Sequence, residues 1–315
     1  MQETTPIYNM KLNRIRIFPA TLRLAAFGLL VWSLAWRVQA QDTNLNLQAI
    51  QTAAGKGDAK AQFELSRCYA KGNGVPQNYD QAAKYVRQAA DQGYAPAQTQ
   101  LGYFYGVGLG VGKDTAEALK WYQKAAEQGD AVAQFTLGNF YFTGREVPTD
   151  TTQAVQWWQK AADQNLPEAQ NALGQLYFQQ GATNYGNYTN ALLWLCKAAG
   201  QGYIGSMNNL GVMYEYGKGV GVNWPKAAKW YRLAAEQGNA EAQVNFGNLY
   251  LGGRGVPADL VQAYKWLELS YEQGNSKSRS SLFEIMHSRN FTTNQLAEAD
   301  KMIRDFHARQ AHRKP

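Results

Sequence analysis

Residues 95 to 129 read APAQTQLGYFYGVGLGVGKDTAEALKWYQKAAEQG, and this pattern occurs six times along the chain. Five successive intervals separate the six copies; four are 36 residues long and one is 37, with the extra residue between Gly181 and Asn190. A fixed period of this size is typical of a helical repeat array. The pairs that mark the period are Leu65-Ser66, Leu101-Gly102, Leu137-Gly138, Leu173-Gly174, Leu210-Gly211 and Phe246-Gly247.

The end signals of each unit predict two helices. The first helix ends at a loop glycine, namely Gly72, Gly108, Gly144, Gly181, Gly217 or Gly253. The second helix starts after a side chain that can accept free backbone N–H groups, namely Asn78, Asp114, Asp150, Asn187, Asn223 or Asp259. It ends at residues that tolerate a left-handed backbone, namely Gly93, Gly129, Asn165, Gly202, Gly238 and Gly274.

The small pairs and the aromatic residues of each unit predict how the helices pack. Small residues at Leu-Gly and at Ala-Ala, as in Ala125-Ala126, let two helix backbones approach closely. An aromatic residue that recurs with the period is expected to be buried between neighbouring units. Its six occurrences are Tyr85, Trp121, Trp157, Trp194, Trp230 and Trp266.

The motif Ala-x-Ala-Gln-x-x-Leu-Gly followed by Ala-x-x-Trp-Tyr-x-x-Ala-Ala-Glu-Gln-Gly resembles the Sel1-like repeat, a relative of the tetratricopeptide repeat. The resemblance covers about residues 59 to 290. It implies an all-α, right-handed α-solenoid superhelix of helix-turn-helix units, whose first helices line a concave groove. The six expected repeats are 59–94, 95–130, 131–166, 167–203, 204–239 and 240–275.

Additional helices are expected at both ends of the array. Residues 41–58 match only the second half of a unit and predict an N-terminal capping helix. Residues 276–310 combine a degenerate first helix with an amphipathic helix that starts at Thr292 and Gln295 and covers the last exposed seam. A basic tail, 311–315, follows.

Residues 1–40 have the features of a secretory signal peptide. Lys11, Arg14, Arg16 and Arg23 precede an apolar run from Leu24 to Trp36, and Val38 and Ala40 suit cleavage after Ala40. The alternative is an uncleaved anchor, but this run is shorter than the ~20 residues that cross a bilayer. Translation can start at Met1 or Met10. We therefore expect an exported protein, in the periplasm, the cell envelope, a secretory lumen or the medium, without a membrane span after cleavage.

The net charge of +7 does not predict nucleic-acid binding, because the excess lies at the chain ends. Five Lys or Arg side chains lie in residues 1–40 and five in 301–315, with one acidic residue in each segment. The remaining 21 basic and 22 acidic residues nearly balance. Because residues 41–300 carry no excess of cations, they give little reason to expect contacts with a phosphate backbone.

No pattern in the sequence predicts catalysis, a cofactor or a metal site. His-Glu-x-x-His, Cys-x-x-Cys and Ser-x-x-Lys are absent. The glycine-rich stretch Gly106 to Asp114 follows a helix rather than a strand, so it is interpreted as a turn. Cys68 and Cys196 lie three units apart, so we expect two free, buried thiols and no disulfide.

The predicted partner-binding groove follows from tetratricopeptide-like packing. Positions two before, two after and five after each Leu are expected to face it, and Asn171 is expected to pack against nothing that the fold requires. The candidates are Phe63, Arg67, Thr99, Tyr103, Phe135, Asn139, Phe142, Asn171, Gln175, Phe178, Asn208, Glu215 and Asn248. Carboxamides can bind a peptide backbone and aromatics can bind its side chains. Alternatively, the aromatics bridge neighbouring units and the Asn side chains are tolerated surface residues.

The hypothesis that follows is a non-enzymatic scaffold that binds an extended protein or peptide in its groove. The alternative is an exported enzyme or binder that acts on cell-wall material, with a weak β-lactamase-like activity or an association with peptidoglycan. That alternative rests on the export signal and on activities associated with secreted relatives of the resembled family. In those relatives a cysteine pair within each repeat forms a disulfide bond, and this sequence lacks such pairs.

Overall fold

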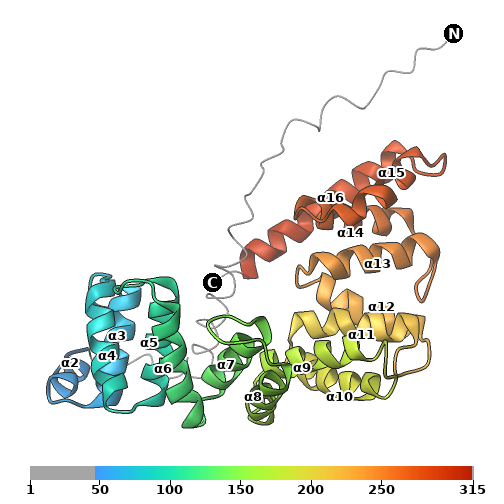
Figure 1. Cartoon of the computed structure of the whole chain (residues 1–315). Helices are drawn as coiled ribbons and strands as arrows, with labels where there is room; N and C mark the ends of the chain where they lie inside the picture. The colour runs from blue at the N-terminus through green and yellow to red at the C-terminus, as the bar shows by residue number, and fades with distance from the viewer. Residues whose placement is uncertain (1–46, 314–315) are drawn as a thin grey trace. The chain divides into compact units, whose positions relative to one another are not determined.

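The computed structural model describes residues 47–313, and this part of the chain is helical without strands. It divides into two compact units, with the boundary between Thr149 and Asp150. The predicted signal peptide lies outside the described residues. Within 47–313 the expectation of an all-α array of helix pairs is confirmed (Figure 1).

Each unit consists of successive helices that pack on their neighbours in the chain. Unit 1 contains α2 (Leu47–Gly55), α3 (Ala59–Lys71), α4 (Tyr79–Asp91), α5 (Ala95–Val107), α6 (Thr115–Glu127) and α7 (Ala131–Thr143). Unit 2 contains α8 (Thr151–Asp163), α9 (Pro167–Gln180), α10 (Asn187–Gly200), α11 (Ile204–Tyr216), α12 (Trp224–Ala235), α13 (Ala240–Gly252), α14 (Leu260–Glu272), the 3-10 turn η2 (Ser276–Ser278), α15 (Arg279–His287) and α16 (Thr293–Arg313). The first helices of the six repeats are therefore α3, α5, α7, α9, α11 and α13.

Five of the six predicted helix starts are confirmed by side-chain caps. Asn78, Asp114, Asp150, Asn223 and Asp259 each accept a hydrogen bond from a backbone N–H of the first turn. The prediction for Asn187 is wrong, because α10 begins at Asn187 itself and its cap is Gly186. The extra residue of this repeat lengthens the preceding turn, where the Asn184 side chain accepts from the Gly186 N–H instead.

The small residue after each Leu does permit close helix packing, as expected. A methyl group built at Gly211 would lie 2.4 Å from the Tyr231 ring, and one at Gly174 would lie 2.7 Å from the Leu195 side chain. Ser66 takes this position in repeat one, where its hydroxyl donates to the Ala82 carbonyl at 2.8 Å. The pair thus brings the two helices of one repeat into contact.

A chain of glutamine hydrogen bonds joins most repeats to the one before. In repeat one, Gln92 Nε2 donates to Gln62 Oε1 at 2.7 Å, and Gln62 Nε2 donates to the Ala54 carbonyl at 3.3 Å. The same arrangement satisfies the carbonyls of Ala90, Ala162 and Ala235 through the pairs Gln128–Gln98, Gln201–Gln170 and Gln273–Gln243. These bonds satisfy a helix-end carbonyl that the close packing has removed from water.

The recurring aromatic residue is buried at some repeats and partly exposed at others. Trp121, Trp194 and Trp266 are buried, whereas Trp157 and Trp230 are half-buried. The expectation that the recurring aromatic is buried is therefore wrong for Tyr85, Trp157 and Trp230, which are half-buried. A lysine three residues further on lies over the ring at three repeats, close enough for a cation–π interaction. These lysines are Lys124, Lys160 and Lys197, with distances to the ring centroid of 4.1, 3.8 and 4.2 Å.

The predicted capping helices cover both ends of the array. At the N-terminal end, Ile50 and Ala54 of α2 pack with Leu65 of α3. At the C-terminal end, Thr292 and Gln295 exchange backbone and side-chain hydrogen bonds at the start of α16. Helix α16 then buries Ala299, Ile303 and Phe306, and the Phe306 ring lies 5.7 Å from the Trp266 ring of α14.

Both cysteines are free thiols in the structure, but the expectation that they are buried is wrong. Cys68 is partly buried against the α2–α3 cluster and Cys196 is exposed on α10. Burial raises the pKa of the Cys68 thiol, and the nearby Glu64 carboxylate raises it further. This thiol is therefore poorly ionised at neutral pH.

Repeat three departs from the others in its backbone. Within the described chain, Glu146 (φ 58°) and Asn165 (φ 64°) are the non-glycine residues with positive φ. Glu146 occupies the loop position that Gly74, Gly110, Gly219 and Gly255 hold in other repeats, all with positive φ. A glutamate in this conformation carries a steric strain that a glycine avoids.

Candidate partner-binding surface

The first helices of the five later repeats are almost uncharged. Helices α5, α7, α9, α11 and α13 contain no Lys, Arg or His, and their acidic residues are Glu168, Glu215 and Glu241. The cations of the repeats instead lie mainly on the second helices and loops. Any ligand of these first helices therefore meets amides, hydroxyls, aromatic rings and a few carboxylates.

The structure places the predicted groove residues at very different depths. Phe63, Thr99, Tyr103, Phe135 and Asn171 are buried. Arg67, Asn139, Phe178, Asn208 and Glu215 are half-buried, and Phe142, Gln175 and Asn248 are exposed. The half-buried and exposed residues can reach a partner directly, whereas the buried five are already in contact with other parts of their own unit.

In unit 1 the predicted positions form an aromatic lining. The Phe63 ring meets the Tyr94 ring edge-on, with centroids 5.5 Å apart, and the Arg67 guanidinium lies 5.9 Å from the Phe63 centroid. Arg67 also pairs with Glu64 at 3.0 Å on the same helix. Burial raises the pKa of the Tyr103 hydroxyl. The arrangement favours apolar contacts.

At the end of α3, a lysine lies close to this lining. Burial, with a smaller contribution from repulsion by the nearby Arg67, lowers the pKa of Lys71 to about 8. Helix α3 therefore carries the cations Arg67 and Lys71 beside the Glu64 carboxylate, whereas α5 and α7 contain no Lys, Arg or His.

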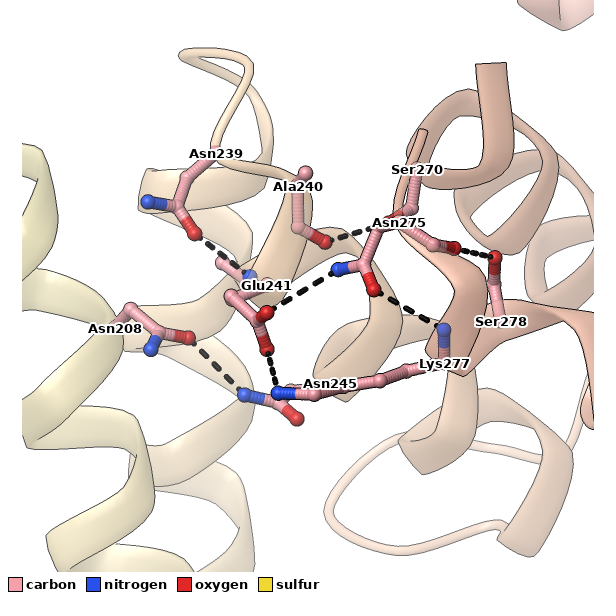
Figure 2. Close-up of polar contacts among 10 residues, drawn as sticks. Asn208, Asn239, Ala240, Glu241, Asn245, Ser270, Asn275, Lys277 and Ser278 are labelled. Atoms are coloured by element: carbon pink, nitrogen blue, oxygen red, sulfur yellow. Dashed lines mark hydrogen bonds and ion pairs between the residues drawn. The ribbon is translucent and has the colours of Figure 1, made fainter. Parts of the chain in front are cut away.

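In unit 2, polar side chains link successive first helices. Ser206 of α11 donates to the Asn171 side chain of α9 at 2.8 Å. Asn245 of α13 donates to Asn208 of α11 at 3.0 Å (Figure 2). Ser281 of α15 donates to the Asn248 side chain at 3.0 Å. We call these three bonds the amide ladder.

The C-terminal part of the amide ladder continues into an ion pair. The Glu241 carboxylate accepts from Lys277 Nζ at 2.9 Å and from Asn275 at 3.4 Å, which ties α13 to the turn η2 (Figure 2). Asn275 in turn caps η2 by accepting from the Lys277 N–H at 3.1 Å. Both partners of the ion pair are well exposed, so its contribution to stability is small.

The expectation that Asn171 packs against nothing is wrong. Its side chain is buried and accepts the hydrogen bond from a hydroxyl that is itself fully buried. Removing it would leave the Ser206 hydroxyl without this partner in a dry environment. Asn171 is therefore a structural residue of unit 2, whatever else it binds.

Glu215 is held between two tyrosines at the loop end of α11. The Tyr231 hydroxyl donates to Glu215 Oε2 at 2.6 Å. Burial raises the pKa of Tyr231, and the hydrogen bond to Glu215 raises it further. The negative charge of Glu215 likewise raises the pKa of Tyr216, whose ring is 62% exposed.

Sequence reasoning missed several residues of this surface. Ser206, Asn245 and Ser281 bind the predicted asparagines from the following repeat, but none of them occupies a position that the packing analogy selects. Asn245 and Ser281 share one signal, since each directly precedes the apolar residue of the Leu-Gly position. Tyr185 and Tyr216, both more than 60% exposed, were missed because loops and helix ends lie outside the analogy.

The described residues contain no group of three or more His, Cys, Asp or Glu side chains placed to hold a metal ion. In 47–313, no helix combines the length and the apolar character that crossing a bilayer requires. What the surface offers chemically is hydrogen bonding by amides and hydroxyls, aromatic contact, and a few carboxylates.

Helix pairs of one repeating pattern, joined by glutamine bonds and closed by terminal helices, define an all-α repeat protein of the solenoid type. The Sel1 repeat family model matches residues 59–94, 95–130, 131–166, 167–203, 204–239 and 240–275. The chain therefore belongs to the Sel1 repeat family, a family of repeat scaffolds.

Solved structures support this assignment. A protective antigen present in uropathogenic Escherichia coli strains, which displays an SLR fold, is 36% identical over 83% of this chain, with a TM-score of 0.71. This chain spans 56% of that protein. A Sel1 repeat protein from Oxalobacter formigenes is 31% identical, with a TM-score of 0.64, over 76% of this chain and 96% of that one. No curated protein matches the chain.

Proposed function

We propose that this protein is a non-enzymatic scaffold that binds an extended segment of a protein partner along the first helices of its repeats. The observation that carries the proposal is the amide ladder of unit 2. The half-buried Asn208 and the exposed Asn248 each accept through Oδ1 from a later helix, so their amide N–H groups are left for a ligand.

The residues that remain accessible support an extended ligand rather than a compact one. Within unit 2, Gln175 and Asn248 are exposed on α9 and α13, two repeats apart, so a single small ligand does not account for both. A peptide main chain offers alternating N–H and C=O groups, which amide side chains bind without a requirement for charge. Affinity then comes from several modest contacts.

We also propose that the protein acts outside the cytosol, because residues 1–40 carry the pattern of a cleaved secretory signal. On this proposal, N-terminal sequencing of the protein purified from its native source begins at Gln41. Recovery of a membrane-integral chain that retains Leu24 to Trp36 would contradict it.

The binding proposal is tested with the mature protein as bait in a crosslinking pull-down from its native compartment. The variant Gln175→Ala/Asn248→Ala changes exposed side chains in two repeats of unit 2, so its melting temperature should stay close to that of the wild type. Each lost contact should weaken the captured partner by ~1 kcal/mol, about fivefold. The expected result is a folded variant that captures much less of the same partner.

A matched control changes exposed residues of the second helices. Gln88 and Gln156 lie on α4 and α8, so Gln88→Ala/Gln156→Ala should leave capture unchanged. If the control weakens capture and the first-helix variant does not, the partner binds the opposite row of helices and the proposed binding surface is wrong.

A further inference from the structure

The loop end of α11 carries two highly exposed tyrosines beside a carboxylate. Tyr185 and Tyr216 are 63% and 62% exposed, and Glu215 is half-buried between Tyr216 and the buried Tyr231. The Tyr185 hydroxyl donates to the Gly217 carbonyl at 3.2 Å, which holds this ring next to the residue that follows Tyr216. We call Tyr185, Glu215 and Tyr216 the tyrosine–carboxylate rim.

The Glu215 carboxylate differs from the other acidic groups on the first helices of unit 2. Glu168 is buried on α9, and Glu241 is paired with Lys277 at 2.9 Å. Within residues 47–313, the ion pairs found do not include Glu215. Its hydrogen bond from Tyr231 occupies one oxygen atom and leaves the negative charge in place.

Two cations of the neighbouring loops lie over aromatic rings outside the rim. Lys218, in the loop after α11, has its ammonium 5.5 Å from the centroid of Tyr188. Arg254, in the loop after α13, has its guanidinium 5.1 Å from the centroid of Trp224, and its positive charge partly offsets the effect of Glu215 on the pKa of Tyr216. Helices α9, α11 and α13 themselves contain no Lys, Arg or His that could neutralise the rim.

We propose that the tyrosine–carboxylate rim binds an arginine or lysine side chain of the partner segment, which makes the preferred partner a basic peptide. The proposal rests on the proposed function and specifies the chemistry of its ligand. A guanidinium or ammonium would bond to the Glu215 carboxylate, while the exposed rings would contact the cation and the aliphatic part of its side chain. Charge complementarity disfavours an acidic segment in unit 2, because α9, α11 and α13 offer it no Lys, Arg or His.

The experiment is a selection of randomised twelve-residue peptides displayed on phage, with the full mature protein as the target. Parallel selections use wild type, Glu215→Gln and the control Glu298→Gln. Glutamine retains an oxygen that can accept the Tyr231 hydroxyl, so Glu215→Gln is expected to fold. Glu298 is exposed on α16, far along the chain from the rim. Thermal melts of all three proteins verify the folded state.

The expected result is an enrichment of Arg and Lys among peptides selected by wild type and by Glu298→Gln, and its loss with Glu215→Gln. In one selected peptide, replacing the Arg by neutral citrulline should lower affinity for wild type roughly tenfold, and less than about twofold for Glu215→Gln. The double variant Tyr185→Ala/Tyr216→Ala should weaken the Arg peptide with only a small decrease in melting temperature, since both rings are exposed and only the Tyr185 bond to Gly217 is lost.

The remaining outcomes separate the two proposals. Peptides selected without a charge bias, or with an acidic bias, would overturn the assignment of the rim and leave peptide binding intact. A selection that enriches no peptide at all would overturn both. If chitohexaose binds wild type and not the Tyr185→Ala/Tyr216→Ala variant, the rings bind sugar and the cationic-peptide assignment is wrong.

Discussion

The first helices of the two units use different chemistry to meet their neighbours. In unit 1, the Phe63 ring packs against the Tyr94 ring, and Arg67 of α3 pairs with Glu64 on the same helix. In unit 2, amide and hydroxyl groups such as Asn208 and Asn245 are bonded across the repeats. Apolar packing tolerates small shifts, whereas hydrogen bonds between helices require a defined register. The comparison indicates that unit 2 holds its first helices in a more exact register than unit 1.

The largest expected effect comes from a buried residue of the same repeat position in each unit. Phe104 of unit 1 and Met213 of unit 2 are both fully buried on their first helices. Phe104→Ala should destabilise the protein by about 3–5 kcal/mol and Met213→Ala by about 2–5 kcal/mol. Because repeats contact their neighbours in the chain, each change should loosen its own unit first.

Hydrogen exchange measured by mass spectrometry distinguishes the two variants. Phe104→Ala should increase exchange in α3 to α6 well before α11 to α14, and Met213→Ala should do the reverse. Equal loosening of both units by either variant would show that the array unfolds as a single block.

A smaller effect is expected from the amide ladder. Asn171→Ala should destabilise unit 2 by about 1–3 kcal/mol, because the buried Ser206 hydroxyl loses its acceptor. Urea denaturation measures this change, and the double variant Asn171→Ala/Ser206→Ala should recover part of it because no donor is then left unpaired. If Asn171→Ala is as stable as wild type, the bond contributes nothing to the register of α9 and α11.

The smallest expected effect lies in the last loop of unit 1. Glu146→Gly should stabilise the protein by about 0.5–1 kcal/mol, because glycine adopts a positive φ without steric strain. Part of the gain is offset because glycine loses more conformational entropy on folding. Asn165→Gly is the matched comparison at the end of α8, and its gain should be only a few tenths because asparagine tolerates this conformation. A loss of stability in Glu146→Gly would mean that its side chain makes a contact worth more than the strain.

Much of the fold could be predicted because the signals that define it are local and repeated six times. Asp114 caps the helix that follows it by bonding to an N–H three residues away, so its role is visible in a short window of sequence. The prediction that Asn187 caps its helix was wrong because it too relied on a local pattern. One extra residue shifted the turn, and the local pattern gave no measure of where the helix would begin.

The glutamine chain between repeats was also present in the pattern but could not be interpreted from it. Gln62 and Gln92 recur with the period, yet they are 30 residues apart and meet only when the second helix of a repeat folds back on the first. A hydrogen bond between distant residues depends on the distance and angle between two helices. Spacing along the chain does not specify either.

The sequence by itself determined the all-α repeat architecture, the Sel1 repeat assignment, most helix ends and the absence of cations from the later first helices. Only the tertiary structure decided which candidate side chains remain accessible. Asn171 and Asn248 occupy first helices of the same repeat pattern, but one is buried against Ser206 and the other is exposed. Exposure depends on the rotation and distance of the next helix, and these follow from side-chain packing across the whole junction.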